Sequence, residues 1–432
     1  MKMNSLSKGK KKTVLIIGGG ASGMVAAIEA ARYGSDVILL EKENRVGKKL
    51  LATGNGRCNF ANTAAQPRHF HGADDRIVQS VLKKVPVAEV LSFFEMIGIT
   101  SKEEEDGKIY PYSDQGSNVL DLLRYEMQRM GVLVKTEQQA ASFHKQPERW
   151  RIETTSGDRY EAEGVILAAG GKAGSQFGAN ESGYHLAKSV GHTLTPLTPA
   201  LVQIKLEAPW LKTLKGVKWQ GAATVTASGK PLRREKGELL FTDYGISGPP
   251  ILQLSRHVHG HTDEKIELWI HLLHDWTSEA VENHFMARFH LDPDKPAELC
   301  LVGLFHKRLI PVLFREAGIS SLQQPAHMVP IKSIKLLASI CQNWKIPITG
   351  TLSWQQAQVT SGGVSTREIN PDTMASLIVP GLYLTGEIMD VDGDCGGFNL
   401  YWAWATGMIA GRHAAAEKEA FDAANTVAED SC

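Results

Sequence analysis

The sequence predicts an α/β protein in which a discontinuous Rossmann-like domain carries an inserted lobe. Two observations predict this class. Near the N-terminus a strand pattern, a glycine-rich turn, a helix pattern and a second strand pattern follow one another within about 30 residues, the arrangement of a βαβ unit. Strand patterns and a last helix return after Gly350, so the chain leaves the first domain and later comes back to it.

The first half of the chain supplies the N-terminal part of this domain. All-apolar runs rich in Val, Ile and Leu are typical of buried parallel strands, and an Ala-rich stretch favours a helix with small residues toward the sheet. Between residues 131 and 169, alternating segments indicate a short strand meander. The predicted strands are 14–17, 37–41 and 164–169, and the predicted helices are 24–33, 87–96 and 118–130.

The character of the sequence changes after Pro196 and Pro199. Strand and turn signals then predominate, a mainly helical stretch follows, and the last helix is expected at about 399–416. The basic residues 1–12 are expected to be frayed, and the polar tail after Asp422 to be disordered. We predict a nucleotide-binding domain from 1–195 and 363–432, a β-rich lobe from 196–275 and 345–362, and a helical subdomain at 276–344.

Composition excludes several function classes. Among 432 residues, 47 Lys and Arg balance 47 Asp and Glu, so no overall field favours nucleic acid or an anionic membrane. No charge-free apolar run approaches the roughly 18 residues of a membrane-spanning helix. The cysteines form no C-x-x-C pair, which disfavours a zinc ribbon or a dithiol redox site. We therefore expect a soluble cytoplasmic protein that binds neither membrane nor nucleic acid.

The strongest chemical signal is Gly18-x-Gly20-x-x-Gly23, which follows the first strand and opens the first helix. In such a turn the first glycine permits the tight bend, the second lets the backbone approach a pyrophosphate, and the third allows close helix–strand packing. The helix N-terminus offers free N–H groups to the phosphates. Glu41 follows Gly18 by 23 residues, where a carboxylate can accept hydrogen bonds from ribose hydroxyls. The complete unit favours a bound dinucleotide over a turn without ligand.

A second signal near the C-terminus favours FAD over NAD. In many FAD proteins a late strand ends in Gly-Asp, whose carboxylate reaches the ribityl or pyrophosphate region. Here Gly386-Glu387 follows the strand predicted at 382–384, and a glycine-rich stretch at 392–399 leads into the last helix. The N–H groups at the start of that helix can stabilise the negative charge of a reduced flavin. The alternative is an ordinary glycine-rich helix start.

These motifs belong to a set that spans the chain: 18–23, 47–59, 110–113, 168–171, 237–242, 245–249, 360–364 and 386–399. Among these segments, the Gly-Arg-Cys-Asn block at 56–59 is the most specific motif. With these segments the chain resembles the bacterial FAD-dependent oxidoreductases of the YhiN/BaiN type, whose relatives include aminoacetone-oxidase-like proteins. The resemblance implies bound FAD, a discontinuous flavin domain, and an inserted β-barrel-like lobe with a small helical region.

The motifs and the resemblance together give a set of predicted cofactor contacts. Without the resemblance, the 54–59 segment would be interpreted as a surface turn. The 360–363 segment is placed toward the flavin N5 side by the family pattern alone. The predicted cofactor-binding residues are Gly18, Gly20, Ala21, Ser22, Gly23, Glu41, Lys42, Lys49, Thr53, Gly54, Asn55, Gly56, Arg57, Cys58, Asn59, Ala169, Gly170, Gly171, Gly386, Glu387, Asp394, Gly396, Gly397, Phe398, Asn399 and Leu400.

Other candidate sites are weaker. His257, His259 and His261 alternate, with Asp263 and Glu264 nearby, and on one strand face they could bind a metal. A solvated hairpin edge is the commoner origin of such a run, and we predict no metal site. Residues 205–236 contain eight basic residues and only two acidic ones. This excess of positive charge could bind an anionic ligand such as NADPH, but we favour the interpretation that it is a solvated face.

Catalytic groups are not marked by any motif. Cys395 stands at a helix N-terminus, where the pKa of a thiol can be lowered, although packing is the more common role for it and for Cys58. Arg57, Tyr110 and Tyr112 are candidates for lining the site, and no general acid or base is singled out. The sequence selects no oligomeric state.

The leading hypothesis is an FAD-dependent oxidoreductase that transfers hydride at flavin N5 to or from a small organic substrate. NAD(P)H is the candidate reductant, although no second Gly-x-Gly-x-x-Gly unit provides a separate domain for it. The protein supplies binding and orientation, whereas the flavin performs the redox chemistry. Two alternatives stay open, a flavin-dependent RNA-modifying enzyme and a non-catalytic flavin-binding redox sensor. The basic stretch at 205–236 supports the first of them.

Overall fold

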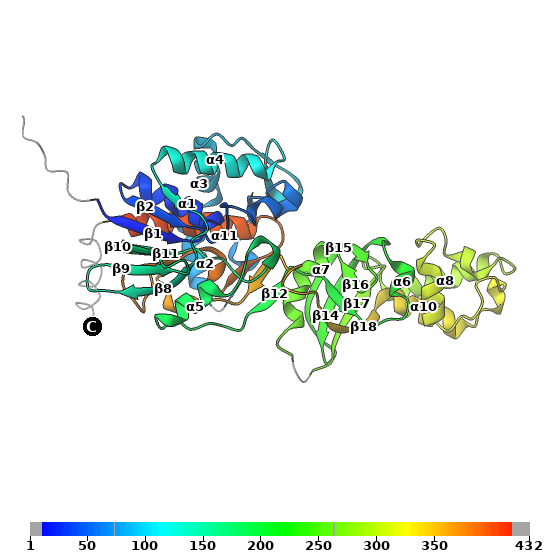
Figure 1. Ribbon diagram of the computed structural model, residues 1–432. Helices are drawn as coiled ribbons and strands as arrows, with labels where there is room; N and C mark the ends of the chain where they lie inside the picture. The colour runs from blue at the N-terminus through cyan, green and yellow to red at the C-terminus, as the bar shows by residue number, and fades with distance from the viewer. Residues whose placement is uncertain (1–10, 73, 262–263, 417–432) are drawn as a thin grey trace, which may run out of the picture. The chain divides into compact units, whose positions relative to one another are not determined.

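The computed structural model in Figure 1 describes residues 11–72, 74–261 and 264–416. The chain forms two compact units, and each has its own apolar core. Unit 1 comprises Met1–Thr198 and Val359–Cys432, and unit 2 comprises Pro199–Gln358. Our expectations for residues 1–10 and for the tail after Asp422 concern positions outside the described residues.

Unit 1 is built on a five-stranded parallel sheet with the strand order β20-β11-β1-β2-β7. The central strand β1 has partners on both sides, so that Ile16 pairs with Leu39 of β2 and with Ile166 of β11. All three side chains are fully buried, as the all-apolar runs predict. The strands are β1 (Thr13–Ile17), β2 (Asp36–Leu40), β7 (Leu133–Lys135), β11 (Gly164–Leu167) and β20 (Leu382–Leu384). The Rossmann-like class is confirmed.

Helices from both ends of the chain pack together in unit 1. A Cβ on Gly407 would lie 2.5 Å from the Ser22 carbonyl oxygen, and one on Gly411 would lie 2.5 Å from that of Ala26. Glycines at both positions therefore let the last helix approach the first one closely. The helices of this unit are α1 (Ala21–Arg32), α2 (Asp75–Lys84), α3 (Val87–Met96), α4 (Gly116–Arg129), α5 (Ser182–Ser189) and α11 (Phe398–Ala415).

Three small antiparallel sheets complete unit 1. The pairing of β4 with β21 sets His71 opposite Asp392 and so joins two segments that are distant in sequence. One sheet has the order β10-β9-β8, with β8 (Ala140–Lys145), β9 (Trp150–Thr154) and β10 (Arg159–Ala162). The other two are β3 (Ala61–Asn62), β6 (Lys108–Pro111) and β5 (Ser101–Glu103), and β4 (Phe70–Gly72) with β21 (Val391–Gly393).

A buried histidine holds the segment after α5 against the C-terminal part of unit 1, which begins at Val359. His192 Nδ1 lies 2.9 Å from Glu368 Oε2, and His192 Nε2 lies 2.8 Å from Ser376 Oγ. Thr193 adds a backbone N–H bond of 2.9 Å to the same Glu368 oxygen. The side chains of His192, Glu368 and Ser376 therefore connect residues that precede unit 2 in the sequence with residues that follow it.

Unit 2 contains a closed barrel with the strand order β13-β16-β15-β14-β17-β18. Its interior is apolar and includes Leu239, Phe241, Leu268 and Ile270. The strands are β13 (Ile204–Leu206), β14 (Lys218–Ala227), β15 (Lys230–Phe241), β16 (Gly245–Ser247), β17 (Ile266–His271) and β18 (Trp344–Thr351). Two short helices, α6 (Leu211–Leu214) and α7 (Pro249–Leu254), also belong to this part.

The chain between β17 and β18 is helical. Its helices are α8 (Ser278–Leu291), α9 (Leu309–Glu316) and α10 (Ile331–Gln342). Phe285 of α8, Leu313 of α9 and Leu337 of α10 are fully buried in the same core as the barrel residues. Two further strands, β12 (Thr198–Ala200) and β19 (Val359–Ser361), stand where the chain leaves unit 1 and where it returns.

Candidate cofactor-binding site

The predicted cofactor residues meet at one edge of the parallel sheet. The glycine-rich turn follows β1, Glu41 follows β2, Ala169–Gly171 follow β11, and Gly386-Glu387 follow β20. Parallel strands present their carboxyl ends at the same edge, which is where ligands bind in open α/β sheets. The topology therefore brings four separate segments of the sequence to one place.

The turn after β1 is shaped for close backbone packing. Gly18 has φ +109°, and a Cβ there would lie 2.4 Å from the Ala168 carbonyl oxygen. A Cβ on Gly23 would lie 2.0 Å from the Gly18 carbonyl oxygen. Both positions therefore require glycine for steric reasons within the fold itself.

Gly20 differs from these two glycines because a Cβ there would have no neighbour within 4 Å. Gly20 precedes α1, and no side chain caps that helix start. The backbone N–H groups of Ala21, Ser22 and Gly23 have no partner within the helix and point toward its N-terminal end. An open space beside uncapped N–H donors suits a pyrophosphate.

Glu41 is held in a defined orientation beside this turn. Its Oε2 accepts a hydrogen bond of 2.8 Å from Gly19 N, and its Oε1 accepts one of 2.8 Å from Glu43 N. Burial raises the pKa of Glu41 above its usual range, although these two N–H groups act in the opposite direction. Burial likewise lowers the pKa of the neighbouring Lys42. The carboxylate lies after β2, at the same sheet edge as the glycine-rich turn, and its ribose contact stays a prediction.

Lys49 and Glu387 join two predicted segments by an ion pair, with Nζ 2.6 Å from Oε2. The other Glu387 oxygen accepts a 2.9 Å hydrogen bond from Thr360 N. Thr360 Oγ1 in turn accepts bonds of 2.9 and 3.0 Å from the backbone N–H groups of Lys172 and Ala173. A Cβ on Gly171 would approach both Thr360 Oγ1 and Glu387 Oε1 within 2.6 Å. A polar network thus connects the residues after β11 and β20.

The 50–59 segment follows an irregular path next to the start of α11. Its backbone is left-handed at Gly54, Asn55, Gly56 and Cys58. Thr53 Oγ1 donates a 2.7 Å bond to the Leu50 carbonyl oxygen. Asn59 is buried, and a Cβ built on Gly397 would lie 2.7 Å from its Oδ1.

The residues that open α11 pack against the same segment. Asn62 Nδ2 donates a 2.8 Å hydrogen bond to the Gly396 carbonyl oxygen, which stitches the two segments together. Asn399 closes the 393–399 loop by accepting from Gly393 N at 2.8 Å and donating to Gly393 O at 2.9 Å. Phe398 is buried and stacks on His69 at 4.5 Å between ring centroids, and Leu400 is half-buried. The predicted N-terminal and C-terminal cofactor segments are therefore neighbours.

The Arg57 side chain interacts with other side chains of the protein. Its guanidinium forms ion pairs with Glu104 and Asp114 and lies 4.0 Å above the Tyr110 ring. Hydrogen bonds to these two carboxylates raise the pKa of Arg57 further above its usual value. Tyr110 is buried, whereas Tyr112 is 70% exposed. Arg57 and Tyr110 share one cluster beside the left-handed segment, and Tyr112 is directed to solvent.

The two cysteines of the predicted site have raised pKa values. Burial raises the pKa of Cys58 to about 12, although a hydrogen bond with the Thr53 side chain acts to lower it. Burial also raises the pKa of Cys395, although Lys108 acts in the opposite direction. For Cys395, loss of hydration therefore acts against the lowered pKa that a helix start can produce. Packing is the role that the structure favours for both thiols.

Two polar groups near the site have no counterpart in our sequence analysis. His71 Nε2 lies 2.8 Å from Oδ1 of the buried Asp394, a predicted cofactor residue. The contact depends on the pairing of β4 with β21, for which short strands give no local signal. Tyr184 is buried on α5 and lines a cavity of about 290 Å³. A single Tyr in a helical pattern indicates nothing beyond packing.

The histidine run is not on a strand face, so the arrangement considered for a metal is wrong. His257 belongs to a short helical turn (Ser255–Val258), His259 Nε2 lies 3.1 Å from Thr351 Oγ1, and His261 Nδ1 lies 3.1 Å from Glu264 Oε1. Asp263 is outside the described residues. Across residues 11–72, 74–261 and 264–416, no three His, Cys, Asp or Glu side chains gather as metal ligands.

The basic residues of the 205–236 stretch are spread over β13, α6, β14, β15 and the link between α6 and β14 in unit 2. Lys215 pairs with Asp243 at 2.7 Å, and Lys218 with Glu238 at 2.9 Å. Lys230, Arg234 and Lys236 are exposed along β15. In the part of the chain that the structure describes, no helix combines the length and apolar character needed to cross a bilayer.

A parallel sheet, a glycine-rich turn over uncapped N–H donors and a carboxylate after the second strand define a dinucleotide-binding Rossmann protein. Residues 12–413 match the HI0933-like protein Rossmann domain family. The chain belongs to this family.

Three characterised proteins are similar to the chain over almost its whole length. The 3-dehydro-bile acid delta(4,6)-reductase of Clostridium scindens is 41% identical over 406 residues, covering 93% of this chain and 98% of the relative. The ribosomal RNA dihydrouridine synthase of Haemophilus influenzae is 30% identical, covering 91% and 96% of the two chains. The enzyme of the same name from Escherichia coli is 29% identical, covering 91% and 95%.

Proposed function

We propose that the protein is an FAD-dependent oxidoreductase that reduces a carbon–carbon double bond conjugated to a carbonyl group. One observation carries the cofactor part of this proposal. The uncapped start of α1 beside Gly20 and the fixed carboxylate of Glu41 offer, at one sheet edge, the donors and acceptor that an FAD pyrophosphate and ribose need. A further glycine with open space, Gly170, follows β11 at the same edge.

The relatives support the reaction type. The name of the Clostridium scindens protein describes reduction of double bonds in a ring system with a 3-oxo group. The name of the Haemophilus influenzae protein describes conversion of uridine to dihydrouridine, in which the reduced double bond is next to a carbonyl. Both names therefore describe hydrogen addition to an electron-poor double bond, and we assign the same chemistry to this chain.

Each part of the site has a role in this proposal. FAD, when bound, supplies the hydride carrier. The N–H groups of residues 21–23 bind the pyrophosphate, and Glu41 accepts from the ribose. Lys49 offsets the charge of Glu387, so that this carboxylate does not repel the phosphates. The N-terminal N–H groups of α11 stabilise negative charge next to the flavin ring.

NAD(P)H is the proposed reductant, and an anaerobic absorption spectrum tests it together with the cofactor. The purified protein is expected to show flavin bands that bleach on addition of NADH or NADPH. Addition of cyclohexenone under anaerobic conditions should then restore the oxidised bands. If the flavin stays oxidised with both NADH and NADPH, NAD(P)H is not the reductant. A protein that neither contains nor takes up FAD would overturn the proposal itself.

A uracil base in RNA is the second candidate for the reduced group. Two relatives bear the name of ribosomal RNA dihydrouridine synthase. The exposed Lys230, Arg234 and Lys236 on β15 offer contacts for phosphates. Incubating the reduced protein with ribosomal RNA and measuring dihydrouridine content tests this candidate. Unchanged dihydrouridine content, with cyclohexenone still reduced, would restrict the protein to small molecules.

A further inference from the structure

Four neighbouring strands of the barrel in unit 2 carry one row of side chains. The strands β15, β14, β17 and β18 are hydrogen-bonded to one another in that order (Figure 1). Thr224 of β14 pairs with Arg234 of β15 and with Trp269 of β17, and Trp269 in turn pairs with Lys345 of β18. Residues that are directly opposite in antiparallel strands project to the same face of a sheet. The four side chains therefore lie side by side.

This row is on the outer face of the barrel. Successive residues of a strand point to opposite faces of the sheet. Val225, Leu268 and Ile346 are sequence neighbours of the row and are buried in the barrel core. The row itself therefore points outward, and Arg234 and Lys345 are exposed.

A second row runs parallel to the first on the same face. Ala222 pairs with Lys236 of β15 and with His271 of β17. His271 Nε2 lies 2.9 Å from Thr224 Oγ1, which connects the two rows. Burial lowers the pKa of His271, and the positive charge of Arg234 acts in the same direction. His271 is therefore neutral at neutral pH, and the charges of the two rows come from the Arg and Lys side chains.

The positive charges of these rows are not compensated. Glu238 and Glu267, the acids next to the rows, are paired with Lys218 at 2.9 Å and with Lys265 at 2.6 Å. Three exposed cations of the rows form no ion pair with another described residue: Arg234, Lys236 and Lys345. Like charges that share one face repel each other, so an anion bound between them is favoured.

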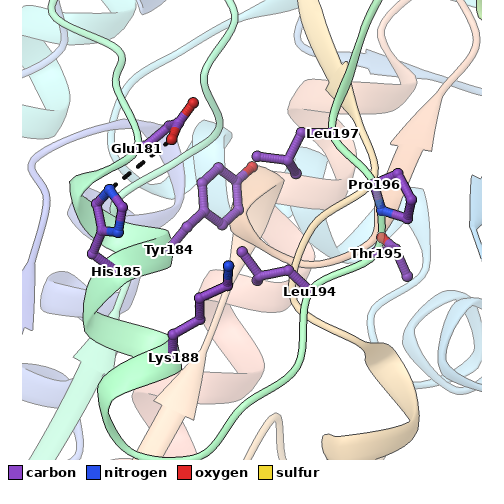
Figure 2. A pocket seen from close by; sticks show the side chains of 8 residues that line it. All are labelled: Glu181, Tyr184, His185, Lys188, Leu194, Thr195, Pro196 and Leu197. Atoms are coloured by element: carbon purple, nitrogen blue, oxygen red, sulfur yellow. Dashed lines mark ion pairs between the residues drawn. The ribbon is translucent and has the colours of Figure 1, made fainter.

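The basic groups on α5 of unit 1 have a different environment. Figure 2 shows His185 directed toward Glu181, with 4.0 Å between Nε2 and Oε2. The same carboxylate pairs with Lys172. In that part of unit 1 an acid stands among the basic groups, whereas the two rows on the barrel contain no acid.

An aromatic ring lies between the cations of the barrel face. Trp269 is half-buried, and Lys345 Nζ lies 4.3 Å from the centroid of its ring. Proteins that bind single-stranded nucleic acid combine cations for the phosphates with aromatic rings on which bases stack. Lipid head groups or an acidic peptide would use the cations alone. The 205–236 stretch by itself indicates a solvated face, but the register adds Trp269 and Lys345 from distant parts of the sequence.

We propose that this outer face of the barrel binds single-stranded RNA. Arg234, Lys236 and Lys345 contact phosphates, and the Trp269 ring stacks on a base. The choice of RNA over DNA rests on the proposed function, whose second candidate is reduction of a uracil base in RNA. The charge and the aromatic ring of the surface are independent of that reaction.

The test measures binding of a fluorescein-labelled oligouridylate of about 20 nucleotides to the full-length, FAD-loaded protein by fluorescence anisotropy at several salt concentrations. The double variant Arg234→Gln/Lys236→Gln is expected to bind about tenfold more weakly than the wild type. The slope of log Kd against log salt should fall by about 1.4, since each phosphate contact on a single strand contributes about 0.7.

The matched control removes two exposed cations from the helical part of unit 2. Lys307→Gln/Lys332→Gln makes the same change in net charge and should keep the wild-type affinity and salt slope. Trp269→Leu keeps an apolar side chain but removes the ring. It should weaken binding about tenfold and leave the salt slope unchanged, because stacking releases no counterions. Thermal unfolding and FAD content are compared first, so that a misfolded variant is recognised.

Equal affinity in the wild type and Arg234→Gln/Lys236→Gln would overturn the assignment, as would equal losses in the control or absence of RNA binding. Phosphatidylglycerol vesicles that bind as tightly as RNA through the same residues would overturn the choice of RNA. RNA that binds through this face without any gain in dihydrouridine would contradict the second candidate function and leave the surface standing. Reduction of cyclohexenone without RNA binding would have the opposite meaning.

Discussion

Lys49 and Glu387 are 338 residues apart in the sequence, yet their side chains form a 2.6 Å ion pair at the edge of the parallel sheet. Both are partly exposed, at 33% and 21% of their side chains, so the pair contributes little to stability by itself. Its importance is local, because it neutralises a carboxylate next to the place proposed for the phosphates of FAD.

Replacing Lys49 by Met should weaken FAD binding about five- to tenfold, since Glu387 would then face the pyrophosphate without a counter-charge. Lys48→Met is the matched control. Lys48 pairs with Glu43 at 2.6 Å, outside the polar network of Glu387 and Thr360. Fluorescence titration of the apoprotein with FAD measures both. Equal losses in the two variants would contradict the role given to Lys49.

Gly20→Val should abolish FAD retention and leave the fold intact. Gly20 has φ −80°, and its Cβ position is open, so a side chain there enters the proposed phosphate space without a clash within the protein. We expect a change in the free energy of unfolding of no more than about 1 kcal/mol. Flavin absorbance of the purified variant and its thermal unfolding are the measurements. A variant with full flavin content would contradict the site.

Gly18→Ala is the informative comparison for the same turn. Its φ of +109° and the 2.4 Å approach to the Ala168 carbonyl oxygen make any side chain strained. This substitution should lower the free energy of unfolding by about 3 kcal/mol. Gly20→Val thus tests binding and Gly18→Ala tests folding, and a reversal of the two outcomes would show that the open position is not the ligand position.

FAD affinity should fall on acidification because of Glu41. Burial raises the pKa of this carboxyl above its usual range, so in the apoprotein it takes up a proton at a higher pH than an ordinary Glu. The protonated group accepts ribose hydrogen bonds poorly, and FAD affinity is therefore lost as the pH falls through that raised pKa. Titrations carried from neutral pH downward should show the loss in the wild type at a higher pH than an ordinary Glu would give. Glu41→Gln should bind more weakly at neutral pH and show no such step.

The stability of unit 1 should also depend on His192. Burial lowers the pKa of His192 although Glu368 acts in the opposite direction, so the unfolded chain is protonated at a higher pH than the folded one. The stabilisation present above the unfolded pKa of about 6.5 is then lost as the pH falls below it. His192→Phe should cost about 1–3 kcal/mol at neutral pH, because Glu368 and Ser376 lose their partner. Urea unfolding at two pH values tests both statements, and a variant with the wild-type pH dependence would contradict them.

Most of unit 1 could be predicted from the sequence because its signals are local. The helix expected at 87–96 is α3 (Val87–Met96), and the last helix expected at 399–416 is α11 (Phe398–Ala415). Strands β1, β2 and β11 are buried on both faces and therefore consist of continuous apolar runs. The glycine-rich turn is recognisable because its steric requirements admit no other residue at Gly18 and Gly23.

The features that were missed depend on contacts between distant segments. His71 meets Asp394 only because β4 pairs with β21, and these short strands have no pattern of their own. Arg57 matches a family motif, but its ion pairs with Glu104 and Asp114 are set by tertiary structure. The raised pKa of Cys395 could not be predicted either, because its position at a helix start is visible in the sequence and its burial is not.

The sheet order has a consequence for how the protein is made. The edge strand β20 and the helix α11 come from the last part of the chain, yet β20 pairs with β11 and α11 packs on α1. Domains begin to fold during synthesis from the N-terminal side. Unit 2, which is continuous in sequence, has all its strands once Gln358 has left the ribosome. The cofactor domain cannot close until the final helix emerges, so truncated chains would carry a finished barrel and an incomplete nucleotide site.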